Sequence, residues 1–270
     1  MRGIRRGTEL FLLACAVLLV PAGAALGADL YLSGALSVSG GSLDAGGGGD
    51  VGEGDFEFSN SGDDTDTSPV IGGVFGYAVP LDEMVPYDWD WPLPRWQLRF
   101  ELEGMFLRDY EFVTTLVGSE NYLTEGQSLT LLHNWWLDVP LHAPLSWAFG
   151  RIPMLEPVSM HFGAGVGMGM TEFKTTSAAF KGSHDAIHLT WQVGAGFDYQ
   201  LTDRVSIGMG YRYVDLGSFD YGLRLLLGTT PVGNFTADLA SHELRTGLRV
   251  NFYSVSSPGS WKRPRFGSGR

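Results

Sequence analysis

Apolar and polar residues alternate with a period of two along most of this chain. In the stretch 95–106, RWQLRFELEGMF, the even-numbered positions up to Leu102 are apolar, whereas the odd-numbered positions from Gln97 to Glu103 are polar or charged. Successive side chains of a strand point to opposite faces, so this alternation predicts a β-strand with one apolar face. No helix of ordinary length with a clear 3.6-residue stripe is found. The pattern predicts an all-β chain.

Eight segments show this alternation. The expected strands are 29–38, 70–79, 95–106, 129–138, 158–171, 189–201, 205–213 and 243–252. Long polar connections are expected at 39–68, 107–126, 172–186 and 216–240, a short one at 202–204, and Pro- and Trp-rich ones at 80–94 and 140–156. The expected fold is one eight-stranded antiparallel up-and-down β-barrel over residues 28–252.

A closed barrel can hold its apolar face inside, as lipocalin-like soluble barrels do, or turn it toward lipid. The polar faces of 158–171 and 189–201 are rich in glycine, from Gly163 to Gly169 and from Gly194 to Gly196. Glycine weakens a solvated strand, but in a narrow lumen it makes room for long side chains. Aromatic residues also lie near the ends of several strands, as they do at membrane interfaces. The pattern therefore favours a transmembrane barrel over a soluble one.

The first 27 residues have a basic start, an apolar run from Leu10 to Val20 and small residues after Pro21, which is the pattern of a cleaved signal peptide. A membrane anchor is less consistent with this segment, because it would need about 20 apolar residues. A lipoprotein signal at Cys15 is also disfavoured, because the apolar stretch before this cysteine is only Leu10 to Ala14. Residues 28–252 carry 11 basic and 29 acidic residues, which argues against a nucleic-acid partner. The expected location is the bacterial outer membrane.

The last strand carries a motif of polar residue, glycine, hydrophobic residue and aromatic residue, at Arg245, Gly247, Val250 and Phe252. With the glycine-rich strand 158–169 and the stretch 206–216, this motif resembles small OmpA/opacity-type outer-membrane barrels of Gram-negative bacteria. The resemblance implies that Gly247, Val250 and Phe252 form a signal for the barrel-assembly machinery. Relatives commonly end at the aromatic residue, whereas this chain continues as a basic Ser/Gly/Pro-rich stretch, 253–270, expected to be a disordered periplasmic tail that could contact anionic envelope polymers.

Three groups of residues are candidates for chemistry. The charged and polar positions expected to line the lumen are Arg99, Glu101, Glu103, His161, Gln192, Asp198, Arg212, Glu243, Arg245 and Arg249. They either line an ion path or pair into a plug, and buried charges favour the plug. A weak Ca²⁺ candidate comprises Asp44, Asp50, Glu53, Asp55, Asp63, Asp64 and Asp66, for which a solvated surface loop is the simpler interpretation. Ser159 and His161 share the lumen face, with His188 on the neighbouring strand, but no flanking pattern selects a nucleophile.

These observations predict an integral outer-membrane protein with a structural or surface-interaction role, no cofactor, no bound metal and no catalysis. Its partners would be outer-membrane lipid, the assembly machinery and extracellular ligands of the loops. A small porin that passes ions or small solutes is the alternative, and a lipid-modifying barrel enzyme is the third.

Overall fold

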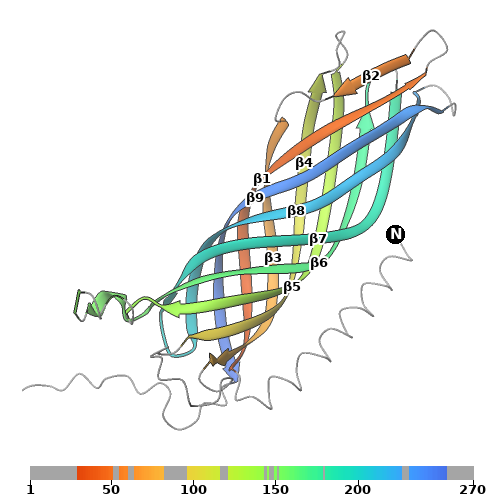
Figure 1. Cartoon of the computed structure of the whole chain (residues 1–270). Coiled ribbons are helices and arrows are strands. Elements are labelled where there is room, and N and C mark those ends of the chain that lie inside the picture. The colour runs from red at the N-terminus through yellow and green to blue at the C-terminus, as the bar shows by residue number, and fades with distance from the viewer. Residues whose placement is uncertain are drawn as a thin grey trace, which may run out of the picture.

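The computed structural model describes residues 29–50, 55–59, 64–81, 96–115, 121–142, 145, 149–150, 152–178, 180–226 and 231–253, and these residues are almost entirely in strands (Figure 1). The strands are β1 (Asp29–Asp50), β2 (Asp55–Ser59), β3 (Asp64–Pro80), β4 (Gln97–Thr115), β5 (Asn121–Pro140), β6 (Val158–Thr176), β7 (Phe180–Gln200), β8 (Val205–Leu225) and β9 (Pro231–Tyr253). A 3-10 turn, η1 (Pro153–Leu155), precedes β6. No helix among the described residues is long and apolar enough to cross a bilayer.

Eight long strands close into an antiparallel barrel, as the alternation predicted. Their order around the barrel is the order of the sequence, β1-β3-β4-β5-β6-β7-β8-β9, and β9 pairs back onto β1 from Leu30↔Tyr253 to Gly49↔Gly233. The short strand β2 pairs only with the far end of β1. Because Asp29 and Tyr253 lie at the same end of the barrel, that end is called the terminal end here and the opposite end the distal end.

The expected strands are all present, but the long polar connections at 39–68, 107–126, 172–186 and 216–240 were predicted wrongly. Most of these residues continue the strands toward the distal end, so that β1 runs to Asp50 and β9 begins at Pro231. A strand of about 9–11 residues crosses a bilayer. With 23 residues, β9 has about twice the length that a crossing needs.

The two halves of the barrel differ in which face is apolar. In the terminal half, outward side chains are apolar and exposed, such as Leu36 at 61% and Leu244 at 67%, whereas inward side chains are mostly polar or glycine, with a few apolar ones such as Val74 and Leu132 among them. In the distal half, most inward side chains are apolar and buried, such as Phe173 and Phe235, whereas most outward ones are polar. The alternation therefore continues along each strand while the chemistry of its faces reverses, which is why the distal segments read as polar connections.

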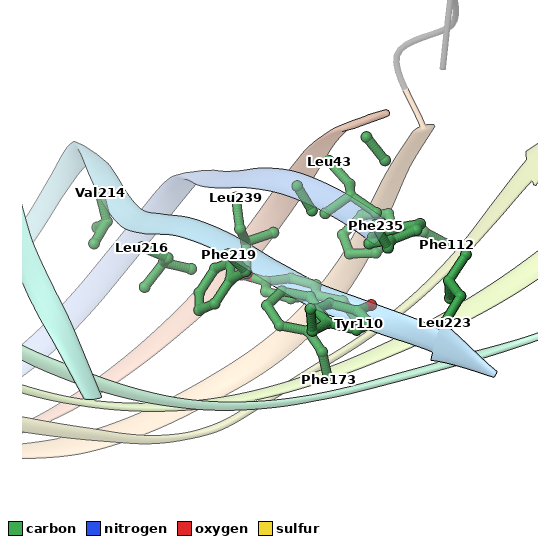
Figure 2. Close-up of a cluster of buried hydrophobic side chains, with 13 residues drawn as sticks. Leu43, Tyr110, Phe112, Phe173, Val214, Leu216, Phe219, Leu223, Phe235 and Leu239 are labelled. Atoms are coloured by element: carbon green, nitrogen blue, oxygen red, sulfur yellow. The ribbon is translucent and has the colours of Figure 1, made fainter. Parts of the chain in front are cut away.

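The distal half is split into two facing sheets. The ladder between β7 and β8 is interrupted at 182–190 and 216–223, and 64–70 of β3 form no ladder with β4. One sheet therefore comprises the distal parts of β8, β9, β1 and β3, and the other those of β4, β5, β6 and β7. Figure 2 shows the apolar cluster packed between strands of the two sheets. Its members are Leu43, Ala45, Tyr110, Phe112, Phe173, Val214, Leu216, Phe219, Tyr221, Leu223, Phe235, Ala237 and Leu239.

The two seams between these sheets are closed differently. At the β3–β4 seam, Ser68 Oγ accepts a hydrogen bond from the Asp109 amide at 2.9 Å, and Asp66 Oδ2 accepts one from the Glu111 amide at 2.8 Å. At the β7–β8 seam, aromatic rings meet instead: His184 stacks on Tyr221 at 5.7 Å, and His188 meets Phe219 edge-on at 4.9 Å. On the distal side of these rings, the β7–β8 ladder resumes only at Phe180 and Lys181.

Two strands contain a bulge that changes which residues face inward. In β4 the bulge includes Leu107, with φ of 67°, and inward positions change from odd to even numbers beyond it. In β8 the bulge includes Gly217, with φ of 93°, and inward positions change from even to odd numbers. Glycine adopts this left-handed conformation readily, whereas it is uncommon for leucine.

Candidate functional site: the charged lumen

All ten residues that the sequence analysis assigned to the lumen lie on inward-facing positions of the terminal half. Seven of them are buried: Arg99, Glu101, Glu103, Gln192, Asp198, Arg212 and Glu243. The other three, His161, Arg245 and Arg249, are partly buried. Because they come from β4, β6, β7, β8 and β9, the closure of the barrel brings them together.

A central layer of charge lies around Arg212. This arginine forms ion pairs with Glu103 and with Glu243, the latter at 2.5 Å. Arg245 reaches the second oxygen of Glu103 at 2.5 Å, and Arg108 reaches Glu243 at 2.7 Å. Each carboxylate is therefore shared by two arginines, and all five residues belong to one network.

Neutral polar side chains complete this central layer. Gln192 accepts a hydrogen bond from Arg212 at 2.9 Å and donates one to Asn134 Oδ1 at 2.6 Å. Asn134 in turn donates to Glu103 at 3.2 Å, and Arg108 donates to Thr130 Oγ1 at 2.8 Å. Most atoms of these guanidinium and carboxylate groups thus keep hydrogen-bond partners that offset the loss of water on burial, whereas Arg108 Nη2 has no hydrogen-bond partner among the described residues.

A terminal layer of charge lies closer to the chain ends. Arg99 Nε is 2.9 Å from Asp138 and its terminal nitrogens are 3.3 Å from Glu101 and 3.7 Å from Asp198. Arg249 approaches Asp138 at 3.8 Å and Asp198 at 3.7 Å. His161 Nδ1 is 2.9 Å from Asp198 Oδ2.

Glu101 connects the terminal layer to two large aromatic side chains. Tyr31 OH donates a hydrogen bond to one of its oxygens at 2.8 Å, and Trp136 Nε1 donates to the other at 2.8 Å. The ring of Tyr31 also lies 5.4 Å from the guanidinium of Arg249. These rings fill lumen space that charged groups alone would leave to water.

The formal charges of the two layers cancel. Among the described residues, the lumen holds five arginines, Arg99, Arg108, Arg212, Arg245 and Arg249, and five carboxylates, Glu101, Glu103, Asp138, Asp198 and Glu243. Arg108 and Asp138 were not among the residues predicted to line the lumen. Arg108 was missed because it follows the β4 bulge, whereas the alternation of Asp138 with Leu137 could have identified it.

The glycines on the inner face make room for these side chains. A Cβ on Gly165 would collide with the Asn134 amide, and a Cβ on Gly196 would lie 2.7 Å from His161 Nε2. A Cβ on Gly194 would lie 2.9 Å from the Cβ of Arg212. Asn134, His161 and Arg212 thus each face a glycine of a neighbouring strand, as small-and-large alternation in a narrow barrel requires.

Two cavities remain in the terminal half. One of about 60 Å³ lies between the two layers and is lined by Arg99, Arg212, Arg245, Arg249 and His161, among others. A larger one of about 450 Å³, the terminal vestibule, opens between the terminal layer and the terminal end of the barrel, and Asp138, Asp198 and Arg249 form part of its lining. The charged layers lie between this vestibule and the distal apolar cluster.

The residues of the weak Ca²⁺ candidate do not form a described site. Asp44 is exposed on the outer face of β1, and Asp66 is used in the β3–β4 seam. Asp50, Asp55 and Asp64 lie in strands, but their side chains are outside the described part, as are the residues Glu53 and Asp63.

A different group, Asp138, His161 and Asp198, has possible metal-ligand atoms within 4.8 Å of one another. Both carboxylates of this group are already paired with Arg99 and Arg249. A cation at this position would lie beside two guanidinium groups, so the donor set does not fit a metal ion.

The residues considered for catalysis are held in separate contacts. His161 is bound to Asp198, and no hydrogen bond between His161 and Ser159 is found among the described residues. His188 lies nearer the distal end, with Nε2 at 2.9 Å from Thr171 Oγ1 and Nδ1 at 3.2 Å from Thr190 Oγ1. The three residues therefore do not meet as a nucleophile with its base.

The residues expected to form the assembly signal occupy both faces of β9. Gly247 is on the inner face and pairs with Ala35 and Gly208. Val250 and Phe252 are on the outer face, where they are 40% and 52% exposed. Outward apolar residues at this end of β9 are accessible to a partner surface or to lipid.

Comparison with known proteins agrees with this architecture. Residues 11–252 match a family model described as "Outer membrane protein beta-barrel domain". The chain belongs to this outer-membrane β-barrel family. Membership accounts for the apolar outer belt of the terminal half, which faces lipid in such barrels. No curated protein sequence matches the chain.

Several solved outer-membrane barrels are similar to this family member in fold. Neisserial surface protein A is 16% identical in sequence, with a TM-score of 0.31, and the alignment covers 81% of this chain and 99% of the neisserial chain. OprG from Pseudomonas aeruginosa shares 13% identity with a TM-score of 0.40, over 83% of this chain and 96% of its own. The outer membrane protease OmpT from Escherichia coli shares 8% identity with a TM-score of 0.40, over 82% and 97%. None of these likenesses defines a role for this chain.

Proposed function

We propose that this protein is a sealed, non-catalytic outer-membrane barrel with a structural or surface-interaction role. The filled lumen carries this proposal. From the terminal end, an inward path meets the terminal charged layer, then the central layer around Arg212, and then the distal apolar cluster. Arginines and carboxylates in ion pairs bind water and ions less than unpaired charges do, and the packed apolar side chains of the distal cluster exclude water.

The distal half is the part that we propose to interact with ligands outside the cell. Its outward-facing charged side chains include Asp44, Asp109, Glu111, Glu125, Glu172, Asp185, Asp220 and Asp238, against Lys174, Lys181 and Arg224. An acidic surface attracts partners with basic groups. In this orientation the terminal end faces the periplasm, and residues 1–27 are a signal peptide removed during export.

Electrical recording in planar lipid bilayers tests the sealed lumen. We expect no stable conductance steps from protein whose folded state has been verified by heat-modifiable gel mobility. A known porin in the same bilayers supplies the positive control. Stable steps that scale with salt concentration would contradict the proposal and favour the small-porin alternative.

A lipid-modifying activity is the other alternative, and its test is separate. Mass spectra of lipid A from cells that overproduce the protein should match those of cells with an empty vector. A new acylated or deacylated species would contradict the non-catalytic role. A matched His161→Ala variant would then show whether the histidine bound to Asp198 takes part.

A further inference from the structure

The connection between β5 and β6, the terminal arm (residues 141–157), is fixed to the barrel at its base. Leu141 N donates a hydrogen bond to Val158 O at 3.0 Å, and Gln200 N of β7 donates one to Pro157 O at 2.9 Å. Farther out, the arm turns at Gly150, where φ is 78° and an added Cβ would meet no described atom within 4 Å. In Figure 1 the arm extends sideways from the terminal end of the barrel, beyond the ends of β5 and β6.

The outer part of the terminal arm exposes large apolar side chains. Among the described residues, Met154 at 83% and Phe149 at 76% have the two largest exposed fractions of any large hydrophobic side chain. Both exceed Leu244, which is 67% exposed in the lipid-facing belt. Neither of the two lines the terminal vestibule, whereas His142 and Glu156 at the base of the arm do. The apolar side chains therefore face the surroundings of the barrel, and exposed apolar surface of this kind marks a contact site.

The sequence of the terminal arm is apolar throughout. It reads LHAPLSWAFGRIPMLEP, in which only four of the 17 residues have a polar side chain, namely His142, Ser146, Arg151 and Glu156. The β7–β8 connection at the same end of the barrel consists of Thr-Asp-Arg at 202–204, and all three residues are exposed. A turn in water has the composition of 202–204. The composition of the arm indicates a less polar environment.

The base of the arm is continuous with the outer apolar belt. Pro157 is bonded to the backbone of Gln200, and the residues on either side of Gln200 are Tyr199 and Leu201, which are 47% and 51% exposed. Phe252, at the same end of β9, is 52% exposed. Exposed aromatic residues at strand ends mark the membrane–water interface of outer-membrane barrels. An arm that extends sideways from this level follows the surface of the bilayer.

We propose that the terminal arm inserts Phe149 and Met154 into the interfacial region of the phospholipid leaflet at the terminal end. Interfacial segments lie in the plane of the membrane with their apolar side chains among the upper parts of the acyl chains. The arm thereby adds a membrane contact outside the strands, on the side of β5 and β6, and fixes the depth of the terminal rim there. This inference depends on the lipid-facing belt and is independent of the sealed lumen and of any ligand of the distal half.

Collision measurements on spin labels test where the tip of the arm lies. Residues 28–270 contain no cysteine, so each label is attached to one introduced cysteine. Phe149→Cys and Met154→Cys report on the arm, Leu248→Cys on the apolar belt and Arg204→Cys on the polar turn. In phosphatidylethanolamine–phosphatidylglycerol vesicles, oxygen concentrates in lipid and a water-soluble nickel complex stays outside. We expect the ratio of oxygen to nickel collisions on the arm to be several-fold higher than at Arg204→Cys and closer to that at Leu248→Cys.

Two results would overturn the proposal. A collision ratio on the arm equal to that at Arg204→Cys would place the tip in water, where a soluble partner could cover it. Spin–spin broadening on the arm that increases with the ratio of protein to lipid would assign the apolar surface to a second copy of the chain. Heat-modifiable gel mobility verifies that each labelled variant is folded.

A charged substitution on the arm gives a second test. Phe149→Asp should withdraw the arm from lipid, because a carboxylate is costly to remove from water, and nickel collisions at Met154→Cys should then rise several-fold. Thr202→Asp is the matched control, since it adds the same charge at an exposed position of the same end. It also keeps an oxygen for the hydrogen bond that Val205 N donates to Thr202 Oγ1 at 3.0 Å. The control should leave the collisions at Met154→Cys unchanged, and an unchanged value in both variants would contradict the proposal.

Discussion

Individual lumen residues depend on partners that are distant in the sequence. Arg108 and Glu243, for example, are 135 positions apart, and their contact is created only when β9 closes on β1. Alternation along a strand predicts which face a side chain takes, so the inward positions of Arg99, Arg212 and Glu243 could be predicted. It does not predict the pairs, because these depend on the register between strands and on the stagger of the closed barrel.

Arg212→Met is expected to be strongly destabilising, because it leaves Glu103 and Glu243 in the lumen with one arginine each. Breaking a buried charge network in this way costs about 3–5 kcal/mol. The measurement is the free energy of unfolding from urea titration in lipid vesicles, with gel mobility as the probe. Arg224→Met, at an exposed position, is the matched control and should change it by about 0.5 kcal/mol or less.

A double variant makes this prediction sharper. Adding Glu243→Gln to Arg212→Met restores equal numbers of positive and negative charges in the lumen. Part of the lost stability should then return. If Arg212→Met alone unfolds at the same urea concentration as the parent, the central layer is not held by Arg212.

Whole strands were predicted better than their ends. The eight strands and their faces in the terminal half follow from alternation alone, as in β6, where Phe162 is outward and Gly163 inward. The distal extensions were missed because their outward side chains are polar and were assigned to connections. Interruptions in the ladders could not be predicted from the pattern: at the β7–β8 seam, β7 keeps its alternation, and the phase change of β8 at Gly217 marks a bulge rather than a lost ladder.

Amide hydrogen exchange should distinguish the two parts of β7. Amides at 182–190 that point toward β8 lack ladder partners, whereas those at 191–200 are paired on both sides. We expect the former to exchange at least tenfold faster, because unpaired edges open without breaking backbone hydrogen bonds. Mass spectrometry of peptides from the folded protein in detergent gives the rates. Uniform protection along 180–200 would mean that the ladder is continuous in solution.

The complete molecule combines a lipid-facing barrel with a two-sheet projection. The terminal half has the apolar exterior that a membrane requires, and the distal half has a polar exterior around an apolar cluster, as water-exposed β-sandwiches do. Family membership accounts for the first half. The second half follows from the side chains of this chain, and it is the part that we propose to contact partners outside the membrane.

Cysteine labelling on one strand face tests this division. Leu248 and Asp238 are both outward-facing and exposed on β9, the first in the apolar belt and the second in the distal half. Cys15 lies in the segment that we propose to be removed on export, so each variant carries a single cysteine. Asp238→Cys should react quickly with a charged maleimide in outer-membrane vesicles, whereas Leu248→Cys should react at least tenfold more slowly, because lipid covers it. Equal reactivity in vesicles, with equal reactivity after denaturation, would show that the apolar belt is not in lipid.

The bulges at Leu107 and Gly217 also constrain how this sequence can change in length. Deleting Leu107 would turn Asp109 and Glu111 toward the apolar cluster and move Tyr110 and Phe112 to the outside. Deleting Gly217 would similarly exchange the faces of Asp220 and Tyr221. Single-residue insertions and deletions are therefore confined to the turns, and a length change inside a distal strand is tolerated only in steps of two residues. We therefore expect changes in length during evolution to fall in the turns and to leave the two bulges in place.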